Sequence, residues 1–226
     1  MKKFELTDEF VTNVFGKRLF RIKALVAFGN VEKGELGGFI EKEGNLSHDG
    51  DAWVSGDAWV SGDAQVSGDA WVSGDAWVSD NAQVSGNARV YGDAWVYGNA
   101  WVSDNALVSG NARVSGDARV FGDARVSGDA WVSGDAQVSG DAWVSGNADY
   151  AVVTGFGRYF RATTFFRCKD KILRVQCGCF YSDLAQFREI VKKTHGDSKY
   201  AKEYLAIADL MELHFSDEEE KQEADE

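Results

Sequence analysis

Hydrophobic and polar residues alternate with a fixed period of six through the middle of this chain, from Gly50 to Ala148. Valine occupies every sixth position from Val54 to Val144, and an alanine stands two residues before each valine. The phrase A-x-V-S alternates as a short strand does, with Ala and Val on one side. The G-D or G-N pair that usually follows is turn chemistry. Each six-residue unit is therefore predicted to form one short strand and one corner.

Three such corners close a triangle, so three units, or eighteen residues, are expected to make one coil of a solenoid. The valines then make about five coils, roughly 25 Å tall. The core is thin, so stability must come from stacking and from the backbone ladder between coils. Asp80 and Asp104 replace the corner glycine, and Asp and Asn tolerate left-handed backbone geometry. We therefore place the left-handed corner residue one position later, at Asp57, Asp63, Asn81 and their equivalents.

The repeat resembles that of the hexapeptide-repeat left-handed parallel β-helix superfamily, with Val as its aliphatic residue and Ala as its small residue. Handedness is implied by this resemblance and does not follow from the period. A pentapeptide-type helix is excluded because the period is six. The expected fold class is mainly β: a left-handed parallel β-helix of three hexads per coil, an N-terminal β cap and a C-terminal ββαα module.

The outward x positions form three columns when the coils are stacked. The first reads Trp53, Trp71, Arg89, Leu107, Arg125 and Trp143. The second reads Trp59, Trp77, Trp95, Arg113 and Trp131. The third reads Gln65, Gln83, Trp101, Arg119 and Gln137. All eight tryptophans of the chain stand at these positions, so none is assigned to the repeat core.

These columns are the candidate binding surface, because a large exposed apolar patch usually marks an interface and Trp is a favoured hot-spot residue. The candidate residues are Trp53, Trp59, Trp71, Trp77, Trp95, Trp101, Arg113 and Trp131. One alternative is that the ladder only stabilises itself through ring stacking and Arg–Trp contacts. Another is a platform that stacks a small ligand or a nucleic-acid base.

The net charge of the chain limits the classes of partner that it can bind. The repeat holds thirteen Asp and four Arg with no Lys or Glu, which gives −9, and the whole chain carries −12. This balance argues against direct binding to nucleic acid or to an anionic membrane. Rows of corner acids keep a rod soluble or mimic nucleic acid for a basic partner. They lack the dense glycine–aspartate phrase of calcium-binding repeats.

No apolar run is long enough for a membrane span, and the first residues do not form a signal-peptide core. Three cysteines are too few for a disulfide framework, which fits a reducing compartment. The expected location is the cytoplasm of a bacterial host cell.

Residues 1–49 are predicted to form the N-terminal β cap, with strands from Phe4 to Val14 and from Lys17 to Phe28. Ile40 and Leu46 are six residues apart and Val54 comes eight later, which indicates an imperfect first coil with a two-residue insertion. The cap is followed by the repeat, residues 50–148.

Residues 149–215 are predicted to form a different unit, with a hairpin of strands from Tyr159 to Cys168 and from Ile172 to Phe180. Asp183 is a good N-cap for one helix, which ends at His195-Gly196, and a second helix runs from about Ser198 to His214. This unit is expected to cover the last coil or to pair with its copy in a dimer. The acidic segment 216–226 is predicted to be disordered.

Catalytic chemistry has weak candidates. Acyltransferases of the hexapeptide-repeat superfamily use a histidine as general base, but the three histidines, His48, His195 and His214, lie outside the repeats. His48 is the least poor candidate for such a base. Cys177 and Cys179 are separated by one residue, which does not fit common zinc spacing, so buried free thiols under the helices are expected. No metal, no cofactor and no catalytic residue is predicted.

The flanks carry a closer resemblance, to a group of small proteins encoded by phages and prophages. It rests on Leu36-Gly37-Gly38-Phe39-Ile40-Glu41-Lys42-Glu43 with Asn45-Leu46-Ser47, and on Val175-Gln176-Cys177-Gly178-Cys179-Phe180 with His195-Gly196-Asp197 and Tyr200-Ala201. The resemblance supplies no activity. The favoured hypothesis is a non-enzymatic binder of a host protein, such as a defence or nucleic-acid-handling factor, or of itself as a homo-oligomer. The alternatives are an acyltransferase and a sponge for a nucleotide-like ligand.

Overall fold

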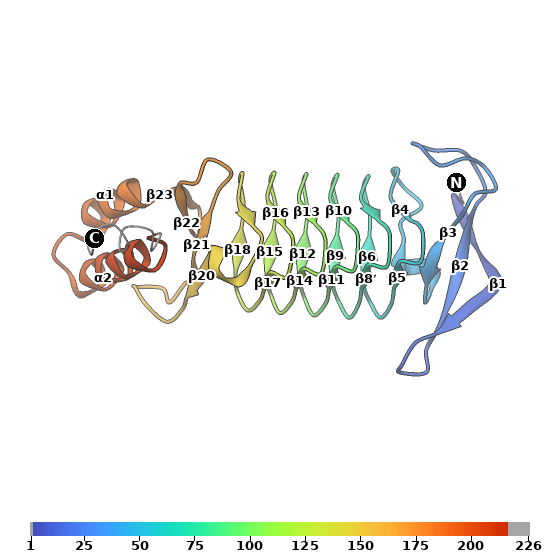
Figure 1. The fold of residues 1–226 in the computed structure, drawn as a ribbon, viewed down its shortest axis with the longest axis horizontal. Coiled ribbons are helices and arrows are strands. Elements are labelled where there is room, and N and C mark those ends of the chain that lie inside the picture. The colour runs from blue at the N-terminus through green and yellow to red at the C-terminus, as the bar shows by residue number, and fades with distance from the viewer. Residues whose placement is uncertain (1, 217–226) are drawn as a thin grey trace, which may run out of the picture.

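The structure is a computed structural model and describes residues 2–216. It is mainly β: a parallel β-solenoid occupies the middle, strands of the N-terminal segment lie at one end, and a small sheet with two helices lies at the other (Figure 1). The segment predicted to be disordered lies, except for Ser216, outside the described residues.

Three parallel sheets form the faces of the solenoid. The first contains β5 (Trp59–Val60), β8 (Trp77–Val78), β11 (Trp95–Val96), β14 (Arg113–Val114) and β17 (Trp131–Val132). The second contains β4 (Trp53–Val54), β7 (Trp71–Val72), β10 (Arg89–Val90), β13 (Leu107–Val108), β16 (Arg125–Val126) and β19 (Trp143–Val144). The third contains β6 (Gln65–Val66), β9 (Gln83–Val84), β12 (Trp101–Val102), β15 (Arg119–Val120) and β18 (Gln137–Val138). Each strand pairs in parallel with the strand of the next coil, so each residue lies opposite the residue eighteen positions later, as Trp59 lies opposite Trp77.

Alternation decides what is buried in these short strands. Every valine from Val54 to Val144 and every alanine from Ala52 to Ala142 is at most 1% exposed. The residue before each valine faces out, and its backbone N–H donates to the next coil, as Trp59 N does to Ala76 O at 2.9 Å. The apolar filling and the backbone ladder therefore repeat together along the rod.

The left-handed corner lies one residue earlier than predicted. Positive φ occurs at the glycine position, for example at Gly56 (65°), and at its two replacements, Asp80 (59°) and Asp104 (58°). Asp57 and the other residues that follow the glycine do not adopt positive φ. Glycine is favoured because a Cβ at Gly56 would lie 3.2 Å from Gly74 O of the next coil. The two Asp replacements tolerate the same conformation without requiring glycine.

The solenoid has about six turns instead of about five, because the segment before the repeat adds one. β3 (Leu36–Ile40) pairs in parallel with β5, and Leu46 bridges to Val66. Both offsets are twenty residues, for example from Phe39 to Trp59. A short 3-10 helix, η1 (Glu43–Asn45), lies between them.

Two antiparallel strands, β1 (Phe4–Thr12) and β2 (Arg18–Ala24), extend the first face beyond β3. Both are shorter than the segments predicted. Their connecting turn at Asn13–Lys17 bends back along the first face, and Gly16 there has a φ of 77°.

The C-terminal unit is a four-stranded antiparallel sheet with two helices. Its strands are β20 (Tyr150–Val153), β21 (Thr163–Arg167), β22 (Leu173–Cys177) and β23 (Phe180–Asp183), preceded by η2 (Asn147–Asp149). The predicted hairpin is present as β21 and β22, but residues 159–162 are a loop and β20 and β23 were not predicted. The two helices are confirmed as α1 (Leu184–His195) and α2 (Lys199–His214), with the Asp183 carboxylate accepting from Gln186 N.

This sheet lies across the last turn of the solenoid. Gln137 N donates to Thr164 Oγ1 at 2.9 Å, and Ser139 Oγ donates to Gln176 Oε1 at 2.8 Å. The Phe166 side chain of β21 is buried in the same hydrophobic cluster as the valines and alanines of the solenoid. The open end of the last coil is covered by these contacts.

Candidate functional site

Four of the eight tryptophans at outward positions are held in one orientation by a recurring hydrogen bond. The indole N–H donates to a serine sixteen residues earlier, on the preceding coil. This occurs from Trp71 to Ser55 (3.0 Å), Trp77 to Ser61 (3.5 Å), Trp101 to Ser85 (3.2 Å) and Trp131 to Ser115 (3.0 Å). The polar atom of each of these rings is satisfied within the protein, so a partner would meet mainly the apolar surface of the ring.

On the first face the rings also contact one another. Trp59 and Trp77 pack edge to face with centroids 5.6 Å apart, and Trp77 and Trp95 do so at 5.2 Å. The Arg113 guanidinium lies 5.2 Å from the Trp95 ring. These contacts stabilise the ladder and leave its outer surface as a continuous aromatic strip.

Trp53 corrects the prediction that every tryptophan is free of the core. It is completely buried, because the N-terminal segment covers the start of the second face. The Phe28 ring packs edge to face on it at 5.4 Å. A Cβ at Gly37 would lie 2.7 Å from its ring. Trp53 is therefore a core residue and is removed from the candidate surface.

Exposure divides the remaining seven tryptophans. Trp59, Trp71 and Trp77 are partly buried by their neighbours, whereas Trp95, Trp101, Trp131 and Trp143 are each 40% exposed or more. They do not form one patch, because the four most exposed rings are spread over three faces. The candidate surface must therefore be divided.

The first face contains the largest hollow described, a groove of about 670 Å³ beside the turn between β1 and β2. One wall is the aromatic strip at Trp77 and Trp95. The other is the hairpin tip, where Val14 and Phe15 are 85% and 77% exposed. Tyr97 stands at the end of the groove, at a position that is serine in most repeats. We call this hollow the aromatic groove.

The sequence did not indicate Val14, Phe15 or Tyr97 as site residues. Tyr97 carried a signal, because Tyr91, Tyr97 and Phe121 are the aromatic residues that interrupt the row of serines. The hairpin tip carried only the exposed apolar pair beside a turn glycine. The hairpin tip lies over the first face because β3 pairs with β5, and a local sequence pattern does not indicate pairing between distant strands.

Two smaller hollows contain two of the other predicted residues, Trp101 and Trp131. Trp101 lines one of about 370 Å³ on the third face with Arg119 and Phe121, and Arg119 lies 5.5 Å from the Trp101 ring.

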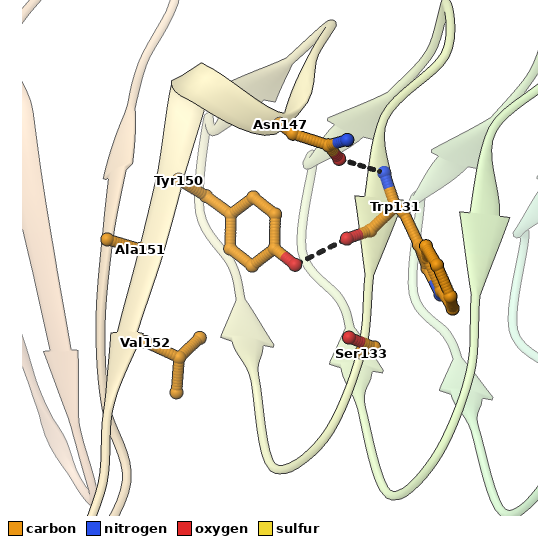
Figure 2. Close-up of a pocket in the computed structure, with 6 residues that line it drawn as sticks. All are labelled: Trp131, Ser133, Asn147, Tyr150, Ala151 and Val152. Carbon is orange, nitrogen blue, oxygen red and sulfur yellow. Dashed lines mark hydrogen bonds between the residues drawn. The ribbon is translucent and has the colours of Figure 1, made fainter.

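Trp131 lines a hollow of about 390 Å³ where the solenoid meets the C-terminal sheet, shown in Figure 2. Its backbone is fixed on both sides there. The N–H donates to Asn147 Oδ1 at 2.8 Å and the carbonyl accepts from the Tyr150 hydroxyl.

The corner rows are mainly acidic, and asparagine replaces the acid at some of their positions. Asn81 Nδ2 donates to Asn99 Oδ1 at 3.1 Å, and Asn99 Nδ2 donates to Asp117 Oδ1 at 2.9 Å. Near the first coil, a hydrogen bond from Lys42 lowers the pKa of Asp63. In this row the two amides stand between Asp63 and Asp117 and separate carboxylates that would otherwise stack.

Ligand atoms of Asp141, Cys168 and Asp170 lie within 4.8 Å of one another at the junction of solenoid and sheet. Burial and the nearby Asp141 carboxylate raise the pKa of the Cys168 thiol to about 12, so it is protonated at neutral pH. Tyr181 Oη donates to Asp141 at 2.9 Å and Arg174 pairs with Asp170 at 2.7 Å. The group is satisfied by its own donors and acts as a structural network.

The prediction of buried thiols under the helices holds only for part of the set. Cys168 is buried, Cys177 is intermediate, and Cys179 is exposed because it lies in the turn after Gly178.

His48, the candidate base, is engaged on both ring nitrogens. Its Nδ1 accepts from Lys3 N at 3.2 Å, its Nε2 lies 2.7 Å from Glu43 Oε1, and its ring packs on Phe4. This arrangement fixes the N-terminal segment to the first coil and leaves no nitrogen for a substrate.

A comparison with protein families gives one match. The model described as the YdcK beta solenoid repeat matches residues 64–80, 82–98, 100–116, 106–120 and 118–134. All five segments lie within the solenoid, so the similarity supports a β-solenoid repeat protein and does not extend to either flank. No curated protein matches the chain. Neither described helix is long and apolar enough to cross a membrane.

Proposed function

We propose that this chain is a non-enzymatic binding protein, a β-solenoid rod that engages a protein partner through the aromatic groove. The observation that carries the proposal is the pairing of two exposed apolar surfaces, the hairpin tip and the Trp77–Trp95 strip, across one hollow. An exposed apolar concavity of this kind is costly in water unless a partner covers it. Its Trp and Tyr rings are the side chains that most often dominate binding energy.

The charges around the groove favour a protein over a nucleotide. Lys17 is the cation that lines it, and its ammonium already pairs with Glu41 at 3.1 Å. Asp80 lines the same hollow and would repel a phosphate. A partner that presents an apolar side chain with a neutral or basic surround fits better.

The finer identity of fold and partner belongs to the same proposal. The six-residue period and two-residue strands support a hexapeptide-repeat helix, and the resemblance to the hexapeptide-repeat superfamily supports its left hand. The resemblance of both flanks to phage and prophage proteins supports a bacterial host protein as the partner. Self-association is the competing occupant, and light scattering over a range of concentrations separates the two.

The test uses two matched double variants. Phe15→Ser with Trp95→Ser removes one side chain from each wall of the groove. Leu36→Ser with Trp143→Ser removes similarly exposed apolar side chains elsewhere. We expect a partner captured from host lysate by the wild-type chain to be lost at least tenfold with the first variant and retained with the second. Equal capture by both variants would remove the groove from the function.

A small planar ligand is the second candidate, because about 670 Å³ lies within the range of ligand pockets. Titration with adenosine and with ATP distinguishes a small planar ligand from a protein partner. Quenching of tryptophan fluorescence by adenosine, abolished by Trp95→Ser, would favour a ligand sponge. Acetyl-coenzyme A, tested by calorimetry, would reveal an acyltransferase, which we do not expect.

A further inference from the structure

The loop between β20 and β21 forms a further, separate hollow at the C-terminal end of the molecule. It measures about 210 Å³ and is lined by the loop, by the end of β22, by α1 and by Tyr204 of α2. Its floor is apolar, with Phe187 and Val191 buried and Ile190 partly exposed. We call it the arginine pocket, because Arg158 and Arg161 stand at its mouth.

The two arginines flank a single aromatic ring. The Arg158 guanidinium lies 5.5 Å from the centroid of the Tyr159 ring, and that of Arg161 lies 5.1 Å from it. Within residues 2–216, neither forms an ion pair with a carboxylate. Other arginines of the same unit do, as Arg174 does with Asp170. The pocket therefore presents two guanidiniums whose hydrogen-bonding edges are not committed to an acid of residues 2–216.

The backbone of the loop is built to hold this arrangement. Gly157 N donates to Glu203 Oε2 at 3.0 Å, and a Cβ at Gly157 would lie 2.1 Å from the Tyr204 hydroxyl. Phe160 has a φ of 51° although it is aromatic and 70% exposed. Such a conformation costs free energy, and Phe160 gains no burial in return. Strained residues of this kind concentrate at ligand clamps.

Nearby acids do not cancel the two guanidiniums. Glu203 is already held by Gly157 N and by Lys199, whose ammonium lies 3.3 Å from it. The unit from 149 to 215 carries eleven Lys and Arg against eight Asp and Glu, a net charge of +3, beside a solenoid of −9. Within residues 149–215 this positive balance favours an acidic partner, whereas the negative charge of the solenoid opposes one.

We propose that the arginine pocket binds an acidic polypeptide segment that inserts one aliphatic side chain between flanking carboxylates. A volume of about 210 Å³ over an apolar floor suits a single side chain better than a drug-sized ligand. The paired guanidiniums suit carboxylates, which arginine binds in a bidentate manner. The pocket is distinct from the aromatic groove, and its occupant has the opposite charge preference.

The test uses fluorescein-labelled peptides of sequence Glu-Asp-Leu-Glu-Asp, Glu-Asp-Ser-Glu-Asp and Lys-Asn-Leu-Lys-Asn with the full chain, read by fluorescence anisotropy. We expect the first to bind, the second to bind several-fold more weakly, and the third not to bind. Arg158→Gln with Arg161→Gln should weaken the first roughly tenfold or more. Lys169→Gln with Lys192→Gln, which removes the same charge from exposed positions that do not line the pocket, should change it less than twofold.

Four outcomes would overturn the proposal. These are no binding of the acidic peptides at about millimolar concentration, equal loss in both double variants, equal affinity for the Leu and Ser peptides, and full displacement by a few millimolar inorganic phosphate. Phe15→Ser with Trp95→Ser should leave the peptide affinity unchanged, so failure here and failure of the aromatic groove are separable. Circular dichroism checks that each variant is folded.

Discussion

The solenoid and the C-terminal unit bury apolar side chains by different means. In the solenoid, a position within six residues decides burial: every Val54 equivalent faces in and every Trp53 equivalent stands outside the coil. In the C-terminal unit, contacts between distant aromatic residues decide it, as where Phe187 packs against Phe165, Phe180 and Tyr204. A regular core leaves the exterior free to vary, so binding surfaces can be added to the solenoid without altering its filling. In the C-terminal unit the same residue, Phe187, serves both the core and the arginine pocket.

The strongest test of burial by position in the solenoid compares a carboxylate on the inward side of one strand with a carboxylate on its outward side. Val84 and Gln83 are neighbours in β9, and only Val84 is buried. Val84→Asp places a carboxylate where no donor lies, so we expect a loss of about 3 kcal/mol or more. Gln83→Asp should stay within about 0.5 kcal/mol. Thermal unfolding followed by circular dichroism compares them, and similar melting temperatures would show that the alternation does not govern stability.

The same substitution at two tryptophans tests where a covering segment buries a residue that its position in the repeat places outside the coil. Trp53→Ala leaves a cavity beneath the N-terminal segment and should cost about 3–5 kcal/mol. Trp95→Ala removes a ring that is 40% exposed and should cost about 1 kcal/mol while abolishing binding at the aromatic groove. Chemical denaturation measures both variants. A mild effect at Trp53 would mean that the N-terminal segment does not cover it.

Trp53 also has the one buried side-chain polar atom without a partner among the described residues, its indole N–H. For four other tryptophans the preceding coil supplies a serine to the indole. The residue that packs on Trp53 is Gly37, where a Cβ would clash with Val54 O at 2.5 Å. Trp53→Phe removes the unpaired donor along with some volume. We therefore expect a much smaller loss than for Trp53→Ala, within about 1.5 kcal/mol of the wild type.

Alkaline pH should destabilise the junction between the two regions. Burial raises the pKa of Cys168 from 9.0 to about 12, so the folded state keeps a proton that the unfolded chain releases above pH 9. The unfolded state then binds fewer protons, and stability falls as pH rises from about 9 toward 12, by up to about 1.4 kcal/mol per pH unit. Tyr181, whose pKa is also raised by burial, adds to this loss. Cys168→Ala should flatten the dependence of melting temperature on pH, and an unchanged slope would assign it elsewhere.

The last expected effect concerns the corners. Gly92 has a φ of 73°, and Gly92→Ala should cost about 1–2 kcal/mol because alanine avoids this conformation. Gly92→Asp should cost less, because Asp80 adopts it and its carboxylate accepts from Gly98 N of the next coil at 3.0 Å. Equal melting temperatures for the two variants would show that the hydrogen bond contributes nothing.

The sequence by itself determined the solenoid. A strict period of six fixes which side chains face inward and which residues stack, because every coil repeats the same local choice and the columns from Trp59 to Trp131 follow from counting. It also determined both C-terminal helices, since the cap at Asp183 and the helical spacing are local signals.

The tertiary structure alone decided which outward residues are available. Covering depends on segments far away in the chain: Phe28 on Trp53, the tip at Phe15 beside Trp95, and Tyr204 against Gly157. It also decided that the glycine and not the following acid takes the left-handed corner, because the close approach of successive coils leaves little room for a Cβ there. A repeat specifies its own interior because every coil buries the same positions. The candidate binding surfaces form where segments from outside the repeat lie against the solenoid or fold beside it.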